Sequence, residues 1–297
     1  MSPIRWPGRK MPDTRGESAP VALPTPLLRP AAAAGPDGLA GWHRTARVPV
    51  PRWPGAEEPD RDSEAFQRAA LNTARWSREG DVITSSQEPP GSGLGGYLVS
   101  DAAYDDFEFE IDVWPDWPAD TGILVRATPD GTRGFQILLD HRKSGNIGGF
   151  FGNGIGSFHA IAFTLDAERD GDTVRLIAED PATTLEPMTA DKPALLAETA
   201  TVSEFLAAWN PSGWNRVSIR CEGTYPVITT WINGVRIARL DTGTLEHPHY
   251  DREAVAKLLG ERGHIALEVH DHDARMGVDR WGADAVVRWR NPRITEL

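Results

Sequence analysis

Cysteine is almost absent from this chain, in which Cys221 is the only one among 297 residues. A single cysteine cannot form an intrachain disulfide, and it excludes a zinc site built from several thiolates. Cys221 alternates with Val217 and Ile219 in one strand-like run, which predicts a buried core side chain. The sequence therefore predicts neither a disulfide framework nor a thiol nucleophile.

Long apolar runs and excess positive charge are also absent. No run approaches the roughly 18 residues that a membrane span requires. The net charge of −12 repels phosphate backbones and anionic lipid, so we expect no nucleic-acid or membrane partner and favour a neutral ligand. Near the N-terminus, Pro24, Pro26, Arg29 and Pro30 interrupt the best apolar segment, so no signal peptide is predicted and a cytoplasmic location is the default expectation. The oligomeric state is not predicted.

Tyrosine is scarce, with 4 residues, whereas there are 11 tryptophans. A tryptophan offers a large flat face with one N–H donor, and such faces suit the C–H surfaces of sugar rings. Core packing and hairpin positions are the favoured explanation for most of these residues. Both interpretations of the tryptophans remain open from composition alone.

The residues that are present predict one large domain behind a tail. Residues 1–38 are rich in proline and alanine and predict a disordered tail, which leaves 39–297 as the globular domain. Short helices are predicted at 63–73 with Ser63 as N-cap, at 203–209, and at 250–260 with Gly260 as the end.

Strand signals fill most of the remaining chain. Residues 106–114, "DFEFEIDVW", alternate apolar and acidic side chains with period 2, which is typical of a half-buried antiparallel strand. Asp130-Gly131 and Asn233-Gly234 are hairpin signals. Further strands are predicted at 122–127, 134–141, within the glycine-rich 144–163, and at 172–180, 214–221, 227–240, 264–269 and 285–297. Many short strands and few helices predict an all-β sandwich of antiparallel sheets.

The stretch "HIALEVHDHD", residues 264–273, carries polar side chains that could bind a metal or act in acid–base chemistry. Period-2 alternation places Ile265, Leu267 and Val269 on one face. Ala266, Glu268, His270 and His272 share the other face for as long as the strand continues. We therefore expect Glu268 and His270 to line an open sheet face, with Asp271, His272 and Asp273 in the exit loop.

In the neighbouring strands, polar and apolar side chains separate less clearly onto opposite faces. In "GFQILLDH", residues 134–141, Gln136, Leu138 and Asp140 share one parity and His141 the other, so both faces of this strand can be buried. Arg126 has the parity of the apolar Leu124. No convincing pair of opposed carboxylates is found.

Several segments in order resemble a known family. They are "GYLVSDAAYDDFEFEIDV", "DTGILVRA", "GFQILLDH", "GWNRVSIRCEGTYPVITTWINGVRIARLDT", "GHIALEVHDHD" and the closing "VVRWRNPRI". Together they make residues 42–297 similar to the 3-keto-disaccharide hydrolase family, a former domain-of-unknown-function family with a concanavalin A-like lectin/glucanase jelly roll.

This chain departs from the family pattern at three places. The family's Asn-Ser-Gly is Asp120-Thr121-Gly122 here, and its Gly-Tyr-Glu is Gly134-Phe135-Gln136, so a carboxylate becomes an amide that can act neither as acid nor as base. The family's Gln-Asp-His-Gly becomes Glu268-Val269-His270-Asp271, in which His270 matches. Arg290-Asn291 match the closing pair.

The resemblance implies an enzyme that cleaves 3-keto-glycosides. A ketone at C3 acidifies the C2 proton, and its removal gives an enediolate that expels the C1 substituent. This route needs one base and a donor or cation near the C3 oxygen, not the two carboxylates of ordinary glycosidases. His270 is the predicted base, because imidazole titrates near neutrality. Arg126 and Gln136 are predicted oxyanion partners, Trp231 a stacking platform, and the remaining predicted substrate contacts are Glu268, Asp120, His141 and Arg290.

Two alternatives accompany this hypothesis. Asp140, Asp271 and His272 could hold a divalent metal that polarises the keto oxygen, or the loop 270–273 could hold a structural calcium; no other cofactor is predicted. The tryptophan content and Gln136 also fit a non-catalytic, lectin-like carbohydrate-binding module. An accessory domain that caps a partner protein is the weakest alternative. The sugar and the linkage are not predicted.

Overall fold

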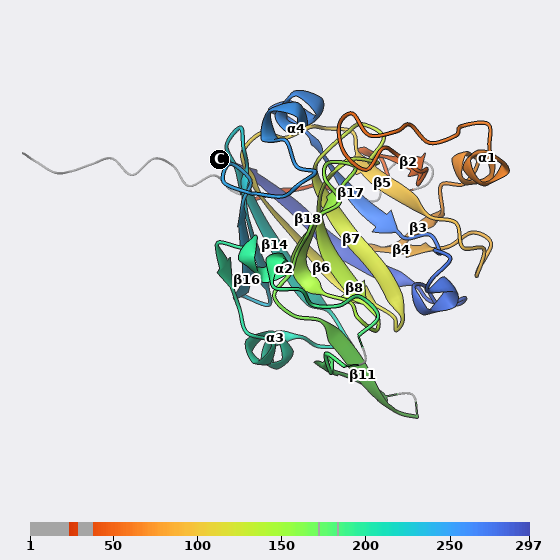
Figure 1. Cartoon of the computed structure of the whole chain (residues 1–297). Helices are drawn as coiled ribbons and strands as arrows, with labels where there is room; N and C mark the ends of the chain where they lie inside the picture. The colour runs from red at the N-terminus through yellow and green to blue at the C-terminus, as the bar shows by residue number, and fades with distance from the viewer. Residues whose placement is uncertain (1–23, 29–37, 172, 183) are drawn as a thin grey trace, which may run out of the picture.

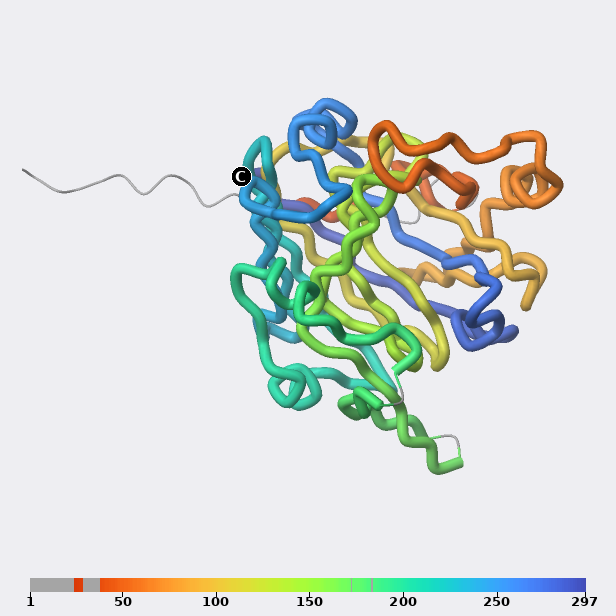
Figure 2. The backbone as a smooth tube through the Cα atoms, viewed as in Figure 1, coloured from red at the N-terminus to blue at the C-terminus, as the bar shows by residue number. Residues whose placement is uncertain are grey.

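The chain folds as a sandwich of two antiparallel sheets (Figure 1, Figure 2). The computed structural model describes residues 24–28, 38–171, 173–182 and 184–297. The predicted all-β jelly-roll class is confirmed. Among the described residues, no helix is long and apolar enough to cross a membrane.

The larger sheet has nine strands, in the order β13-β16-β15-β14-β6-β18-β4-β3, with β1 beside β18. Its strands are β1 (Thr25–Pro26), β3 (Arg75–Glu79), β4 (Val82–Ser86), β6 (Phe107–Pro115), β13 (Glu198–Thr199), β14 (Asn215–Glu222), β15 (Val227–Ile232), β16 (Val235–Asp241) and β18 (Val287–Glu296).

The smaller sheet has seven strands, in the order β10-β9-β8-β7-β17-β5-β2. They are β2 (Trp42–Ala46), β5 (Gly96–Ser100), β7 (Ala119–Ala127), β8 (Gly134–His141), β9 (Ile147–Asn153), β10 (His159–Ala160) and β17 (His264–Val269). A separate hairpin of β11 (Leu165–Asp170) and β12 (Thr173–Ala178) projects from the sandwich (Figure 1). The sequence predicted β12 but not β11.

The helices are short, and the sequence predicted α1, α3 and α4 but neither α2 nor η2. They are α1 (Glu64–Ala70), α2 (Asp191–Ala194), α3 (Val202–Ala208), α4 (Arg252–Leu259) and the single-turn η2 (Gly277–Asp279). The Ser63 hydroxyl caps α1 by accepting from the Phe66 N–H. Gly260 ends α4 at a φ of 72°, a conformation that glycine adopts without cost. The predicted helix ends are confirmed at both sites.

Period-2 alternation builds the core between the sheets. Phe107, Phe109 and Ile111 of β6 are fully buried, while the intervening acidic residues lie on the other side of the strand. Val217, Ile219 and Cys221 continue the same layer on β14, so the prediction of a buried, free Cys221 is confirmed. Asn233 and Gly234 form the turn between β15 and β16, as their dipeptide predicts.

Part of the segment predicted to be a disordered tail forms a strand. Thr25 and Pro26 pair with Ile294 and Arg293 of β18, and the Leu27 N–H donates to the Pro292 carbonyl at 2.8 Å. The sequence does not predict this strand. Proline stands on both sides of Thr25, so Thr25 is the only residue in Pro24-Thr25-Pro26 with a backbone N–H. Residues 1–23 and 29–37 of the predicted tail lie outside the described residues.

Candidate active site

A cavity of about 310 Å³ lies over one face of the seven-stranded sheet. Its floor comes from β5, β7, β8 and β9, and from the residue that follows β17. Its walls come from the segment after β2, from β10, and from the loops that carry Thr132, Arg142, Gly154, Ser157, Glu186 and Arg280. Its titratable and amide side chains include Arg47, Asp120, Gln136, Asp140, Arg142, His159, Glu186, His270 and Arg280.

The β7–β8 hairpin places its polar side chains by register. Asp120 and Asp140 are directly opposite each other across the two strands, so their side chains lie close together on one face. Gln136 shares this face, whereas Phe135 and Ile137 point into the core. The predicted parity of 134–141, with both faces buried, is therefore confirmed.

Glu268 is a buried anchor that holds two other side chains. It is completely buried; its Oε1 accepts from Arg47 Nε at 2.8 Å and its Oε2 from Gln136 Nε2 at 2.5 Å. Gly122 makes room for this contact, because a Cβ there would lie 2.6 Å from Gln136 Nε2. With both oxygens engaged, Glu268 fixes Arg47 and Gln136 and is not available as a base.

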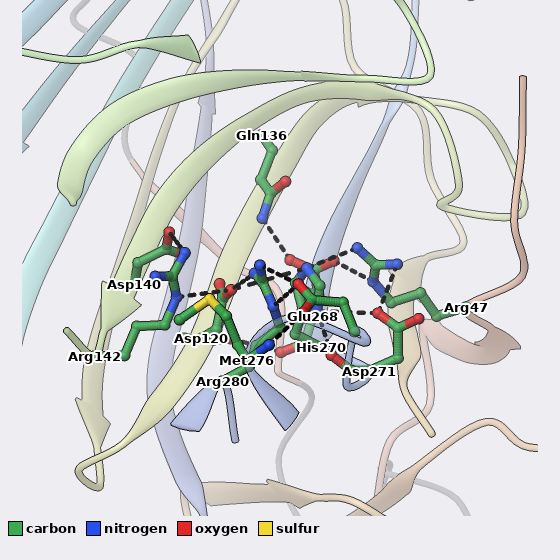
Figure 3. A network of polar contacts seen from close by, with 12 residues as sticks. Arg47, Asp120, Gln136, Asp140, Arg142, Glu268, His270, Asp271, Met276 and Arg280 are labelled. Carbon is green, nitrogen blue, oxygen red and sulfur yellow. Dashed lines mark hydrogen bonds and ion pairs between the residues drawn. The ribbon is translucent and has the colours of Figure 1, made fainter. Parts of the chain in front are cut away.

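His270 stands at the edge of the cavity with both ring nitrogens engaged (Figure 3). Arg47 Nη2 lies 2.9 Å from Nε2; because a guanidinium can only donate, Nε2 must accept. Nδ1 then carries the proton and donates to the Asp271 carbonyl at 2.7 Å. This assigns a neutral imidazole whose basic nitrogen, Nε2, lies 3.9 Å from Asp120 Oδ2.

Asp271 helps to hold the guanidinium of Arg47 beside His270. Its Oδ1 accepts from Arg47 Nη1 at 3.0 Å. Burial alone would raise the pKa of Asp271, but Arg47 and His270 outweigh that cost and hold the pKa well below its usual range. The carboxylate is therefore ionised and balances the charge of Arg47.

Asp120 and Asp140 form the carboxylate pair that sequence reasoning did not find. Burial would raise the pKa of Asp120, but its neighbours His270, Arg280 and Arg142 hold it well below its usual range. For Asp140, burial and then the Asp120 carboxylate raise the pKa well above its usual range. One carboxyl of the pair is ionised and the other keeps a proton, as expected for like charges that share one site.

Two arginines hold this pair in place. Arg142 donates from Nε to Asp120 at 3.2 Å and from Nη2 to Asp140 at 3.3 Å. Arg280 pairs with Asp120 and, through Nη2, with Asp273 at 2.6 Å. Both guanidiniums also approach Glu186, at 3.2 and 3.7 Å. The cavity therefore alternates carboxylates and guanidiniums along one line (Figure 3).

Four predicted site residues lie elsewhere in the structure. Arg126 has a φ of 50° beside an irregularity in the β7–β17 register, and it pairs with Asp105 and Asp106 at 3.4 and 3.2 Å. The expected strand parity fails at this residue, so it cannot be an oxyanion partner in the cavity. Arg290 binds Asp112 at 3.2 Å on the nine-stranded sheet.

Trp231 and His141 also lie away from the cavity. The strand neighbours of Trp231, Thr230 and Ile232, are buried, whereas Trp231 itself is half-buried on the opposite face of β15, in the other sheet. His141 points to the core side of β8, where burial lowers its pKa to about 4. The substrate-contact predictions for these two residues and for Arg290 are therefore not supported.

The predicted metal ligands do not converge. Asp140 binds Arg142, Asp271 binds Arg47, and His272 Nε2 faces the Trp281 carbonyl at 2.9 Å. Across the described residues, no group of three or more His, Cys, Asp or Glu side chains could hold a metal ion. The loop 270–273 offers no calcium cage either, because Asp271 and Asp273 are both engaged by arginines.

The sequence interpretation missed Arg47, Arg142 and Arg280, the arginines that bind the carboxylates of the site. Arg142 continues the parity of Gln136 and Asp140, so the alternation of β8 could have indicated it. Arg47 lies 221 residues from Glu268, and Arg280 lies 160 residues from Asp120. No local pattern predicts contacts of that range.

The solved structures that resemble this chain are distant. The β-glucanase of Bacillus licheniformis is 10% identical, with 94% of this chain and 100% of that chain covered and a TM-score of 0.44. The carbohydrate-binding module CBM66 from Bacillus subtilis is 12% identical, with 75% and 92% covered and a TM-score of 0.42. Similarities this low carry no information about activity. A comparison with curated proteins finds no match.

A family model gives a direct result. The model described as "3-keto-alpha-glucoside-1,2-lyase-like domain" matches residues 37–295, which include every side chain of the cavity and both sheets except for β1 and the last residue of β18. This agrees with the family that the ordered sequence segments indicate, and the chain belongs to the family of 3-keto-α-glucoside-1,2-lyase-like domains.

Proposed function

We propose that this protein cleaves 3-keto-glycosides in the cavity over the seven-stranded sheet, by removal of the C2 proton and loss of the C1 substituent. The observation that carries the proposal is the arrangement at His270. A neutral imidazole lines the cavity, its Nε2 accepts from Arg47 at 2.9 Å, and a carboxylate lies 3.9 Å away. A base, a cation and an anion that stabilises the protonated base therefore lie within a few ångströms.

The first step uses His270 as the base. Nε2 takes the C2 proton, and the electrons of the C2–H bond form the enediolate with the C3 oxygen. The imidazolium that results lies beside ionised Asp120, which stabilises its charge. Asp271, as acceptor of the Nδ1 proton, keeps the ring in the orientation and tautomer that the reaction requires.

Arg47 serves the oxyanion role for which Arg126 was predicted. Its Nη2 shifts from His270 Nε2 to the C3 oxygen when the substrate displaces it, which frees the base and supplies positive charge where negative charge develops. Glu268 and Asp271 keep the guanidinium in place during this shift. Gln136 orients Glu268 and needs no proton-transfer role, which explains how an amide can stand where the family has a carboxylate.

The second step breaks the C1–O bond. The enediolate electrons return to form the C1–C2 double bond, the leaving oxygen takes up a proton, and an unsaturated 3-keto sugar results. Water can then add across the double bond to give the free 3-keto sugar. The net reaction needs no oxidant or reductant, because the ketone is already present in the substrate.

The test is direct turnover of a 3-keto-disaccharide, measured by chromatography of the released sugar, with and without EDTA and added divalent metals. The wild-type protein should release the sugar, and His270→Ala should lose roughly 10²–10⁴-fold in kcat/KM, the usual contribution of a general base. His43→Ala, a half-exposed histidine outside the cavity, is the matched control. No release under any of these conditions would refute the proposal.

A carbohydrate-binding module without activity is the alternative, and the buried Gln136–Glu268 pair is what favours it, since neither side chain can act as base. Calorimetry with unmodified glycans separates the two proposals. Binding that is unaffected by His270→Ala, together with absence of turnover, would favour the module.

A further inference from the structure

We infer that Asp140 is the acid that protonates the departing C1 oxygen, and that the leaving group lies over Phe151 and His159. This inference rests on the proposed function and adds to it a second catalytic group and the orientation of the substrate.

The order of the strands places these groups in a row. The seven-stranded sheet runs β17-β7-β8-β9-β10 across the cavity. Along that order lie His270 after β17, Asp120 on β7, Asp140 on β8, Phe151 on β9 and His159 on β10. The base and Asp140 are thus separated by a single carboxylate, that of Asp120, which approaches both (Figure 3).

The surroundings of Asp140 require a proton on it. Its side chain is 8% exposed, its Oδ2 accepts from Arg142 Nη2, and its Oδ1 has no partner within the described part of the chain. A buried carboxylate oxygen without a donor is costly, whereas a carboxylic acid can donate there instead. Asp120 lies directly opposite on β7, and burial together with the Asp120 carboxylate raises the pKa of Asp140 well above its usual range.

The acid step balances with the base step. As the C1–O bond breaks, its electron pair goes to the leaving oxygen, which takes the proton from Asp140. Asp140 then becomes a second carboxylate beside Asp120, and Arg142 and Arg280 offset the added charge. Asp120 also faces the new imidazolium of His270, so the proton taken from C2 has a short route back to Asp140.

The far side of Asp140 offers a surface for the leaving group. The rings of Phe151 and His159 lie 4.7 Å apart at an interplanar angle of 42°, and both line the cavity. Burial lowers the pKa of His159 to about 4, so the imidazole is neutral at pH 7. A neutral aromatic wall with one hydrogen-bonding edge suits a second sugar ring better than a charged group.

The experiment compares two leaving groups with one preparation of Asp140→Asn. A 4-nitrophenyl 3-keto-α-glucoside leaves as a stable phenolate and needs no acid, whereas a methyl 3-keto-α-glucoside leaves as an alkoxide and does. The variant should lose roughly 10²–10⁴-fold on the methyl substrate and keep the nitrophenyl activity within a few-fold. The ratio of the two rates is independent of the folded fraction of the variant.

A second readout separates this inference from the proposed function. Wild type and Asp140→Asn should both exchange the C2 proton of the substrate for deuterium in D₂O, measured by NMR, because His270 is intact. Asp112→Asn is the matched control, since Asp112 is also a buried aspartate paired with arginines, on the other sheet. It should leave both rates unchanged.

The outcomes are distinct. A wild-type protein that neither exchanges C2 nor cleaves either substrate refutes the proposed function. A wild-type protein that does both, with an Asp140→Asn variant that loses the two cleavage rates equally, refutes only the acid role of Asp140. Selective loss of the methyl substrate supports it.

Discussion

The variant Gln136→Glu restores the carboxylate of the family pattern and tests the contact between position 136 and the buried Glu268. Gln136 is 3% exposed and donates to the fully buried Glu268. Gln136→Glu replaces that donor with a second carboxyl, so two carboxyls meet in a site that has room for one charge. Arg47 is already engaged by Glu268 and Asp271 and cannot neutralise another carboxylate.

The expected loss of stability in Gln136→Glu follows from the short distance between the two carboxyls at positions 136 and 268. Two unit charges about 4 Å apart at an effective dielectric of about 20 repel by roughly 4 kcal/mol, and the contact here is closer. The folded variant therefore keeps a proton on one carboxyl, whose pKa is raised above the value of about 4.3 in the unfolded chain. Near and below pH 4.3 both states are protonated and the loss of stability is small. As the pH rises toward the folded pKa, the loss grows to about 4 kcal/mol.

The assay is thermal unfolding of wild type and variant from pH 5 to pH 8. About 4 kcal/mol corresponds to a Tm difference of roughly 10 °C at pH 8 for a domain of this size, with a much smaller difference at pH 5. Gln136→Met should cost the same at every pH, and Gln67→Glu, which is exposed on α1, should cost little at any pH. A Tm difference for Gln136→Glu that does not increase with pH would show that the Glu268 contact is not as described.

Four shorter predictions follow from the same structure. The folded pKa of Asp140 is raised, so the stability that this group contributes is present below about pH 3.9 and is lost as the pH rises through the folded pKa; Asp140→Asn should therefore match or exceed the wild-type Tm at pH 8. Arg126→Ala should lower the Tm, because it leaves Asp105 and Asp106 unpaired, and leave kcat/KM on a 3-keto-disaccharide unchanged. Trp231→Ala should leave KM unchanged in the same assay, because its side chain is on the other sheet. Phe151→Ala should raise KM for the disaccharide several-fold more than for the methyl glycoside, and an equal effect on both would argue against the leaving-group position.

Local patterns predicted the fold well because the signals of antiparallel sheets are local. The alternation of 106–114 depends only on which face of β6 is buried, and Asn233-Gly234 determines its own turn. The strands β1 to β5, β11 and β13 were not predicted, and β1 and β11 show why a strand can lack a local signal. Thr25 and Pro26 become a strand only because β18 lies beside them, and β11 is largely exposed and polar.

The same difference between local patterns and long-range contacts decides which site residues could be predicted from the sequence. Parity correctly placed Gln136 with Asp140 on one face of β8. The expectation that Glu268 and His270 both line an open face is wrong for Glu268, which is completely buried and bonded to Arg47 and Gln136, whereas His270 lines the cavity. Parity failed at Arg126, where the backbone leaves the extended region. The meeting of Asp120 with Asp140 depends on the register of a hairpin, and the positions of Arg47 and Arg280 depend on contacts between distant segments, which alternation does not encode.

The cross-strand position of Asp120 and Asp140 also limits where this chain can accept an inserted residue. A residue inserted within β8 would shift the strand by one position, turn Asp140 toward the core and bring Leu139 into the cavity. A residue inserted at 128–133, between the two strands, would leave the pairing intact. Variants of this protein should therefore tolerate insertions in the hairpin loop but lose the pair when a residue is inserted between Gly134 and Asp140, so the length of this strand is what keeps the two carboxyls together.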